Sequence, residues 1–454
     1  MRISKFGAWV AGIAAAGLVA TPVGAADVPL EAGARLTLQR AIAIALRYHP
    51  ARLAAQSEAG AAQERVGQAQ SALLPQVFGA AEYLRGTSNG IGDTTYLGVL
   101  GQPRIPSQGR GVNSTATFDN YLMSVSAFQY LFDFGRTRGV IDERRADADV
   151  ARARLRFVDL DLVFHVTQHY YDLLAAKQTV KVFEQAVAQR QEHLHEAEVK
   201  AQAGLKPEID TYTAKAALAR AKLHLVDARN GVDDAKVALD NAMGLGSNAP
   251  DYHQADVLTY EEIGEPLESF LQAALDQRPD LKMLVDEARA AGAHIAQFKS
   301  DYLPTVNATA GYSARGQELP ASNNFDVGVI VSWPLFNGFL TDHEVAEAKL
   351  HQDAIRQAID DLRQRIFLQV KSGYLDWQAS RERIRRAEQT VAAARAELDL
   401  AEKRYESGLG NIIELTDAQR RFTEDDAGYI NALAAFSIAK AALDRDAGSG
   451  LPST

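Results

Sequence analysis

The histidines and serines are the first residues to consider for chemistry. His165 and His169 are four residues apart, a spacing at which two side chains on one helix face could share a metal ion. The sequence positions no carboxylate with this pair, so a packed or solvent-facing pair is the better interpretation. His193 and His195 are two residues apart and lie on different helix faces. No serine has a nucleophile-elbow context and no phosphate-binding glycine loop follows a strand, so the sequence predicts neither an enzyme, a metal site nor a cofactor.

Acidic residues gather where two predicted helices begin. Gly204 and Gly408 each end a long helical stretch, and glycine allows the tight turn that must follow. The helices after these turns open with four acids: Glu208, Asp210, Glu414 and Asp417. One explanation is ordinary helix stabilisation, because an acid near the positive end of a helix dipole contributes a few tenths to about 1 kcal/mol. The other explanation is a functional cluster of charge at the helix turns.

The N-terminus has the order of a secretory signal peptide. Arg2 and Lys5 precede a charge-free apolar stretch from Phe6 to Ala20, and small residues follow it. The stretch is shorter than the roughly 20 apolar residues that a spanning helix needs. We expect residues 1–26 to be removed on export.

Charge and cysteine content exclude several classes of protein. The net charge of −10 becomes about −12 once the two basic residues of the signal peptide are removed, so nucleic acid is not an expected partner. The chain has no cysteine, which excludes disulfides, thiolate metal sites and an acylated N-terminal cysteine. No later segment is long and apolar enough for a transmembrane helix, so any membrane-spanning element must consist of β-barrel strands.

An internal duplication organises the chain. Early positions of each half match at a displacement of 229 residues, as Pro50 does with Pro279, and later positions at 204, as Gly204 does with Gly408. The difference places an insertion in the first copy, in a glycine-rich loop between about Tyr83 and Phe118. The predicted segments are a first repeat at 27–243, a linker at 244–266, a second repeat at 267–447 and a C-terminal tail at 448–454.

Each repeat changes from a helical period to a period of two. Helical patterns from about Arg52 to Leu73 and from Leu281 to Tyr302 are followed by predicted β-hairpins at about 75–134 and 304–336. A soluble sheet with one buried face would give the same alternation. The signal peptide and the aromatic residues near the strand ends favour a lipid-facing barrel wall. Because four strands cannot close a barrel, several chains must contribute to one.

The rest of each repeat is predicted to be a long helical hairpin. The stretches from about Thr137 to Ala203 and from Thr341 to Ser407 would each form a helix of roughly 100 Å at 1.5 Å per residue. Returning helices are expected from Glu208 to Ala242 and from Ile412 to Ala447. The apolar residues recur at spacings of three, four or seven, which indicates a seam that packs against neighbouring helices.

At this point the sequence resembles the TolC family of outer-membrane efflux channels. The residues that carry the resemblance are Leu-Pro pairs before each first strand, YLFDFGR and PLFNGF after the second strands, and the helix turns AGLKPEID and RYESGLGNIIELTDAQ. The resemblance covers nearly all of the chain after the signal peptide. It implies an α+β membrane protein and a homotrimer: a twelve-stranded barrel in the outer membrane, four strands per chain, joined to a periplasmic α-helical barrel.

The resemblance also implies a role and partners. The chain is expected to be the outer-membrane channel of a tripartite efflux pump or type I secretion system in a Gram-negative bacterium. It would contact outer-membrane lipid and dock through a periplasmic adaptor protein to an inner-membrane pump of the RND, ABC or MFS type. The alternative is a periplasmic coiled-coil adaptor or scaffold whose alternating segments form a soluble sheet. Adaptors usually have one hairpin between β-rich halves, whereas this chain has a duplicated unit.

The resemblance assigns roles to the helix turns, expected near 204–208 and 408–412. Tyr405 and Asp210 resemble the pair that holds the periplasmic gate shut. Glu414 and Asp417 resemble inward carboxylates at the pore entrance, and threefold symmetry would make six of them. The turns themselves are expected to form the tip and an adaptor-docking surface, through Gly204, Leu205, Gly408 and Leu409. The sequence departs from the family at Gly410, where some members carry a gate arginine, and it leaves Lys206-Pro207 without a role.

Overall fold

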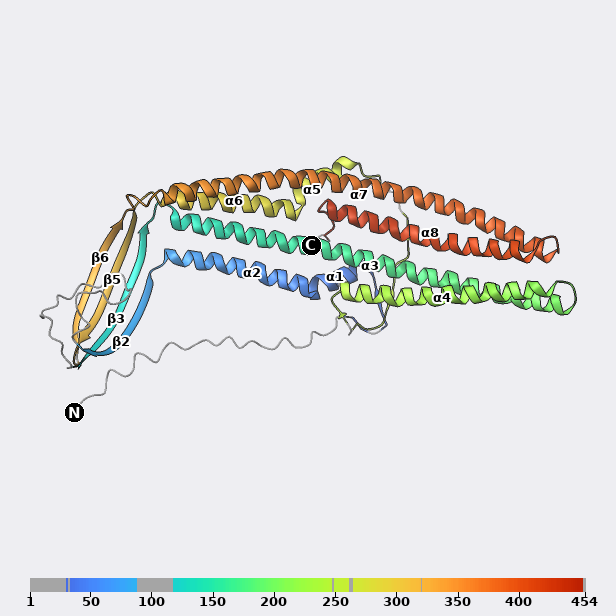
Figure 1. Cartoon of the computed structure of the whole chain (residues 1–454), viewed down its shortest axis with the longest axis horizontal. Helices are drawn as coiled ribbons and strands as arrows, with labels where there is room; N and C mark the ends of the chain where they lie inside the picture. The colour runs from blue at the N-terminus through green and yellow to red at the C-terminus, as the bar shows by residue number, and fades with distance from the viewer. Residues whose placement is uncertain are drawn as a thin grey trace.

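A computed structural model of the chain describes residues 30–31, 33–87, 117–246, 249–260, 264–319 and 321–451. The predicted signal peptide and most of the predicted glycine-rich loop lie outside these residues. Figure 1 shows an elongated molecule with a sheet at one end and long helices that run away from it. In the described ranges, no helix is both long and apolar enough to cross a membrane.

The sheet has four antiparallel strands, two from each repeat. Its order is β2 (Gln76–Thr87), β3 (Thr117–Phe132), β5 (Thr305–Gly316) and β6 (Ser322–Ser332). Each repeat supplies one hairpin, and β3 pairs with β5 to join the two hairpins. The sheet remains open, with β2 and β6 as its edges. Both predicted β-hairpins are confirmed.

The register gives the sheet an apolar face and a polar face. Ala308 pairs with Val329 and Ala310 with Val327, so the apolar residues of β5 and β6 gather on one side. Val327 is 79% exposed, which leaves that side uncovered within one chain. On the other side a Cβ at Gly311 would lie 2.6 Å from a carboxylate oxygen of Asp326, so glycine makes room for this acid.

Two helical hairpins make up most of the molecule. The long helices α3 (Arg136–Gln202) and α7 (Leu340–Glu406) have 67 residues each, and the returning helices α4 (Glu208–Ala242) and α8 (Ile412–Asp446) have 35 each. Helix α3 packs against α4, α7 packs against α8, and contacts between α3 and α8 join the hairpins. All four helices begin within one residue of their predicted starts and end within one of their predicted ends.

Shorter helices pack beside the half of each long helix that is nearer the sheet. They are α1 (Leu38–Tyr48) and α2 (Pro50–Gln70) in the first repeat, and α5 (Leu267–Gln277) and α6 (Pro279–Ser300) in the second. Proline begins α2 and α6, since its fixed φ suits the first helical position and it has no N–H to leave unpaired. Helix α2 packs on α3, and α6 packs between α3 and α7.

Two glycines let the returning helices meet these shorter helices end to end (Figure 1). Gly244 follows α4 with φ +76°, and a Cβ there would lie 2.8 Å from the Cα of His49. Gly448 follows α8 with φ +75°, and its Cβ would lie 3.0 Å from the nitrogen of Arg278. Because both positions combine a left-handed backbone with a close approach, the duplication has kept glycine at both junctions for a steric reason.

The segment predicted as an inter-repeat linker contains a strand that the sequence did not indicate. Strand β4 (Tyr252–Gln254) pairs in parallel with β1 (Ala34–Leu36). The Tyr170 hydroxyl lies within hydrogen-bond distance of two acceptors, the Leu36 carbonyl at 2.9 Å and Asp256 at 2.7 Å, which attaches this small sheet to α3. Strands of three residues are too short to show a periodicity, whereas the 11-residue helices α1 and α5 have an amphipathic pattern that the sequence could have indicated.

Candidate functional site

The ends of the two helical hairpins lie farthest from the sheet (Figure 1) and are built alike. Gly204 has φ +70° and Gly408 has φ +77°, the left-handed conformation that ends each long helix. The Leu205 N–H donates to the Lys200 carbonyl at 2.9 Å, and the Leu409 N–H donates to the Arg404 carbonyl at the same distance. We call these two turns, with the first turn of α4 and of α8, the tip.

Four apolar side chains of the tip are exposed. Leu205 and Leu409 are 74% and 76% exposed, and Ile209 and Ile413, one turn further on, are 65% and 61% exposed. Leu409 and Ile413 repeat Leu205 and Ile209 at the displacement of the duplication. Exposed apolar side chains that cluster in this way are typical of a surface that binds another protein.

The acids of the tip partly serve the helices that they begin. Glu208 and Asp210 lie in the first turn of α4, and Glu414 lies in the first turn of α8. The Asn411 side chain caps α8 by accepting the N–H of Glu414 at 2.8 Å, a cap that the sequence reading did not single out. Asp417 lies beyond the first turn, so the helix dipole does not account for it.

Tyr405 is buried at the tip end of the second hairpin. It is 1% exposed and packs in a cluster with Leu398 and Ala401 of α7 and Leu415 of α8. Asp210, from the first hairpin, is 8% exposed. Burial, and after it the charges of Asp210 and Glu196, raise the pKa of the Tyr405 hydroxyl above its usual value. Asp210 is therefore near enough for its charge to act on the Tyr405 hydroxyl.

No hydrogen bond joins this pair in the described part of the chain. The Tyr405 hydroxyl is buried without a hydrogen-bond partner there. Two lysines lie over the aromatic ring instead, with Lys206 Nζ 4.8 Å and Lys200 Nζ 5.3 Å from its centroid. These contacts could not be predicted from the sequence, because about 200 residues separate the lysines from Tyr405.

Lys200 is also held by an acid on its own helix. Its ammonium donates to Glu196 Oε1 at 2.5 Å. Burial alone would raise the pKa of the Glu196 carboxyl, but the hydrogen bond and charge of Lys200, helped by His193, bring that pKa below its usual value. Glu196 therefore favours its charged form and fixes Lys200 beside Tyr405.

A second set of polar contacts joins α3 to the second hairpin. The Gln189 amide donates to Glu402 of α7 at 2.6 Å. His193 lies between two acids, with Nε2 3.7 Å from Glu402 and Nδ1 3.6 Å from Glu196. Arg190 is 9% exposed, and burial lowers the pKa of its guanidinium, against the opposing charge of Glu424 on α8. No role for His193 was predicted, because its partner Glu402 on α7 is about 200 residues away in the sequence.

The two predicted entrance acids have arginine partners. Arg404 Nε lies 2.9 Å from Glu414, whereas Arg420 Nε lies 4.0 Å from Asp417 and Arg420 donates to Glu424 at 2.7 Å. A Cβ at Gly410 would lie 3.0 Å from the Cβ of Arg404, so the backbone of this turn passes close to α7. The guanidinium that approaches Glu414 thus comes from Arg404, a residue that the sequence reading overlooked, and within one chain it offsets part of the predicted negative charge.

The His165 and His169 pair needs a correction. The sequence reading placed no carboxylate beside these residues, but Asp161 lies 3.4 Å from His165 and Asp172 lies 3.7 Å from His169. Carboxylates four residues before and three residues after a histidine share its helix face, which the spacing could have indicated. Across the described residues, no group of three or more potential ligands is arranged to hold a metal ion.

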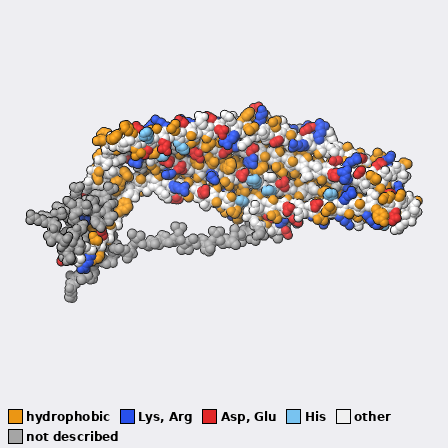
Figure 2. Space-filling model, in the orientation of Figure 1, with side chains coloured by type: hydrophobic (Ala, Val, Ile, Leu, Met, Phe, Trp, Pro, Cys, Tyr) orange, Lys and Arg blue, Asp and Glu red, His pale blue; other side chains and the backbone are white. Residues whose placement is uncertain are grey.

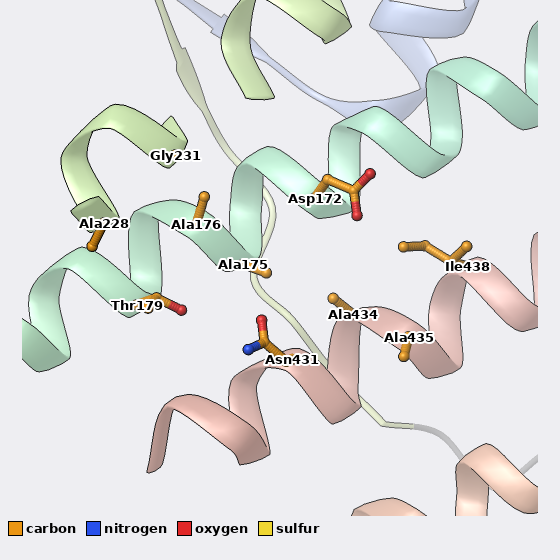
Figure 3. Close-up of a pocket in the computed structure, with 10 residues that line it drawn as sticks. All are labelled: Asp172, Ala175, Ala176, Thr179, Ala228, Gly231, Asn431, Ala434, Ala435 and Ile438. Atoms are coloured by element: carbon orange, nitrogen blue, oxygen red, sulfur yellow. The ribbon is translucent and has the colours of Figure 1, made fainter. Parts of the chain in front are cut away.

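A shallow groove lies between α3, α4 and α8 (Figure 3), lined mostly by small side chains such as Ala175, Gly231 and Ala434. Asp172 is at one end of the groove, and burial raises the pKa of its carboxyl. On the face shown in Figure 2, basic and acidic side chains are interspersed along the helices. The groove has no cluster of charged residues that would mark it as the main site.

Comparisons with known proteins agree with this architecture. The chain is 26% identical over 393 residues to protein CyaE of Bordetella pertussis, covering 85% of this chain and 78% of that protein. It is 24% identical over 377 residues to the outer membrane protein TolC of Escherichia coli, covering 79% and 71%. The solved outer membrane channel CmeC of Campylobacter jejuni has the same fold, with a TM-score of 0.77 at 16% identity over 91% of this chain and 86% of that one.

A match to a family model identifies the family of the chain. The model described as outer membrane efflux protein matches residues 41–245 and 270–449, which include both hairpins and both pairs of long strands. The resemblance found in the sequence is therefore confirmed. The chain belongs to the outer membrane efflux protein family and is an outer-membrane channel protein.

Proposed function

We propose that three copies of this chain form one continuous export duct. The observation that carries the proposal is the open sheet, in which β2 and β6 have unpaired edges while the apolar face is exposed. In lipid, unpaired backbone groups cost several kcal/mol each, so the edges must pair with other copies. Three sheets of four strands would give a twelve-stranded barrel with its apolar face towards lipid and its polar face towards water.

The helices support the same assembly. Away from the sheet the packing order is α4, α3, α8 and α7, so α4 and α7 are the outer helices of this layer. Both have exposed apolar side chains, Leu223 and Val226 on α4 and Leu368 and Leu375 on α7. In Figure 1, β2, α2 and α4 follow one edge of the molecule, while β6 and α7 follow the other. One copy could therefore join the next along its whole length.

The tip is the proposed docking surface for a periplasmic adaptor. The exposed pairs Leu205 with Ile209 and Leu409 with Ile413 support this role, because they offer two apolar patches at the end of the duct. Through the adaptor, the channel would serve an inner-membrane pump of the RND, ABC or MFS type, as part of a tripartite efflux pump or a type I secretion system.

The tip is also the proposed gate. The burial of Tyr405 and Asp210, which come from different hairpins, supports their role in holding the hairpins together. Glu414 and Asp417 are the proposed entrance acids, and threefold symmetry would give six carboxylates, each near an arginine. Such a ring would favour cations over anions.

Bilayer conductance of the purified mature protein tests the duct and its gate. We expect a small closed-state conductance that rises when Tyr405→Leu is combined with Asp210→Ala, and a cation preference that falls in Glu414→Gln with Asp417→Asn. Trimers that stay silent, even after the gate residues are changed, would contradict the duct. If the gate variant raises the conductance but Glu414→Gln with Asp417→Asn leaves the ion preference unchanged, the duct and its gate stand and only the role of the entrance acids is wrong.

A further inference from the structure

Tyr405 is held at the tip by something other than its hydroxyl. The ring is 1% exposed, yet the hydroxyl has no hydrogen-bond partner among the described residues. Asp210 is near enough for its charge to raise the pKa of Tyr405, but no hydrogen bond joins them. Two side chains of the first hairpin do contact Tyr405, and they lie over the face of its ring.

Those interactions come from Lys206 and Lys200. Lys206 lies in the turn between α3 and α4 and places Nζ 4.8 Å from the ring centroid, within the distance at which a cation is attracted to a ring face. Pro207 follows it at φ −63°, which is the angle that proline fixes. Lys200 lies 5.3 Å from the centroid but also donates to Glu196. Lys206 is therefore the residue whose contact with Tyr405 can be tested alone.

We propose that Lys206, assisted by Lys200, positions Tyr405 through a cation–π contact that ties the first hairpin to the second at the tip. This inference rests on the proposed gate and gives Lys206-Pro207 the role that the sequence left open. It requires a positive charge at position 206 and an aromatic ring at position 405. The tyrosine hydroxyl is not required for this contact.

The charge requirement is tested by closed-state conductance in planar bilayers. We expect Lys206→Gln, which keeps much of the length but removes the charge, to raise the closed-state conductance by roughly threefold to tenfold. Lys206→Arg should restore most of the closure, because a guanidinium also binds a ring face. Lys222→Gln, an exposed lysine further along α4, is the matched control. The yield and melting temperature of the trimer identify variants that fail to fold.

The ring requirement is tested by repeating Lys206→Gln in two backgrounds. In Tyr405→Leu the ring is gone, so Lys206→Gln should have no further effect. In Tyr405→Phe the ring remains, so Lys206→Gln should still raise the conductance. An equal rise in both backgrounds would overturn the proposal, because the lysine would then act through another group.

The outcomes separate this inference from the proposed gate. If Tyr405→Leu opens the channel and Lys206→Gln does not, the gate stands and the lysine contact is wrong. If folded trimers of Tyr405→Leu and of Lys206→Gln both remain as closed as the natural protein, Tyr405 is not part of a gate and both proposals fail. If Lys206→Arg is as open as Lys206→Gln, positive charge is not what holds the ring.

Discussion

Buried charges at the tip and further along α3 influence how firmly the two hairpins are joined. Asp210 and Arg190 are each less than one-tenth exposed, and each faces the other hairpin. Removing water from such groups is costly unless opposite charge or hydrogen bonds compensate. The tip therefore depends on the hairpins remaining together, and a change at one of these residues should alter both stability and closure.

Arg404 should control the charge of the pore entrance. We expect Arg404→Gln to increase the preference for cations, because the guanidinium that lies 2.9 Å from Glu414 is removed. The reversal potential in a salt gradient measures this preference. Arg421→Gln is the matched control, since it removes an arginine 2.6 Å from Glu397 in the same hairpin. Equal shifts in the two variants would mean that the pair with Glu414 has no special influence on the pore.

The Glu196 carboxyl should contribute stability that depends on pH. Its pKa is lowered in the folded protein, so this contribution is present above the unfolded pKa and is lost as the pH falls through the folded pKa. We expect Glu196→Gln to destabilise the protein most at neutral pH, by no more than about 1 kcal/mol because the pair is partly exposed, and to have little effect near pH 3. Thermal melting followed by circular dichroism measures the difference. A difference that stays constant with pH would contradict the assignment.

The sequence could predict the residue types of the tip but not their partners. Turn glycines and helix-opening acids follow from local rules, so Gly204, Gly408 and Glu414 could be recognised from neighbours a few residues away. The contacts of Lys206 with Tyr405 and of Gln189 with Glu402 join residues that are far apart in the chain. One sequence without an alignment contains no signal for such pairs.

At the scale of elements, the helix junctions are the most constrained points of the fold. Beside its long helix each repeat has shorter helices that meet end to end, and a Cβ at Gly244 or Gly448 would come within 2.8 or 3.0 Å of the backbone at the meeting point. The long helices bridge these junctions without a break.

We expect Gly244→Ala and Gly448→Ala to destabilise the protein by about 1–3 kcal/mol each. Alanine is strained at φ near +75°, and its Cβ would meet backbone atoms 2.8 and 3.0 Å away. Gly60→Ala is the control, because a Cβ at this helical position would meet no neighbouring atom within 4 Å. Alanine also favours a helix over glycine by up to about 1 kcal/mol. Melting temperatures of purified trimers give the comparison. Junction variants as stable as Gly60→Ala would show that the backbone can relax there.

Element type was predictable wherever a pattern ran long enough. Helices of 67 residues were recognised with almost correct ends, and strands of 11 to 16 residues with a period of two were recognised as two hairpins. Strands β1 and β4 were missed because their pairing is decided by tertiary contacts such as Tyr170 with Leu36. The 11-residue helices α1 and α5 were missed although each has an amphipathic pattern.

At the scale of the whole molecule, the chain is incomplete by itself. Its sheet has open edges, its outer helices have uncovered apolar side chains, and its apolar sheet face has no cover within one copy. The sequence indicated this from strand number alone, since four strands cannot close a barrel. The number three came from the family resemblance, because neither strand count nor helix packing within one copy fixes how many copies close the ring.

Assembly in the membrane should depend on which face of the sheet an introduced charge is placed on. Val327 lies on the apolar face of the edge strand β6 and is 79% exposed, whereas Ile330 lies in the same strand on the polar face, opposite Asn307. We expect Val327→Arg to reduce the trimer in the outer-membrane fraction strongly, because an arginine facing lipid near the midplane costs about 2–4 kcal/mol per chain. Ile330→Arg should assemble nearly normally, because its side chain would face the water-filled duct.

Sucrose-gradient fractionation followed by electrophoresis with and without heating measures the assembled trimer. Since three copies would carry the same substitution, each barrel would contain three destabilising arginines at position 327. The loss of assembled trimer should therefore be close to complete. Equal assembly of both variants would mean that the apolar face does not contact lipid. Loss of Ile330→Arg alone would reverse the assignment of the two faces, and the duct would then have to be lined by the valines of β6.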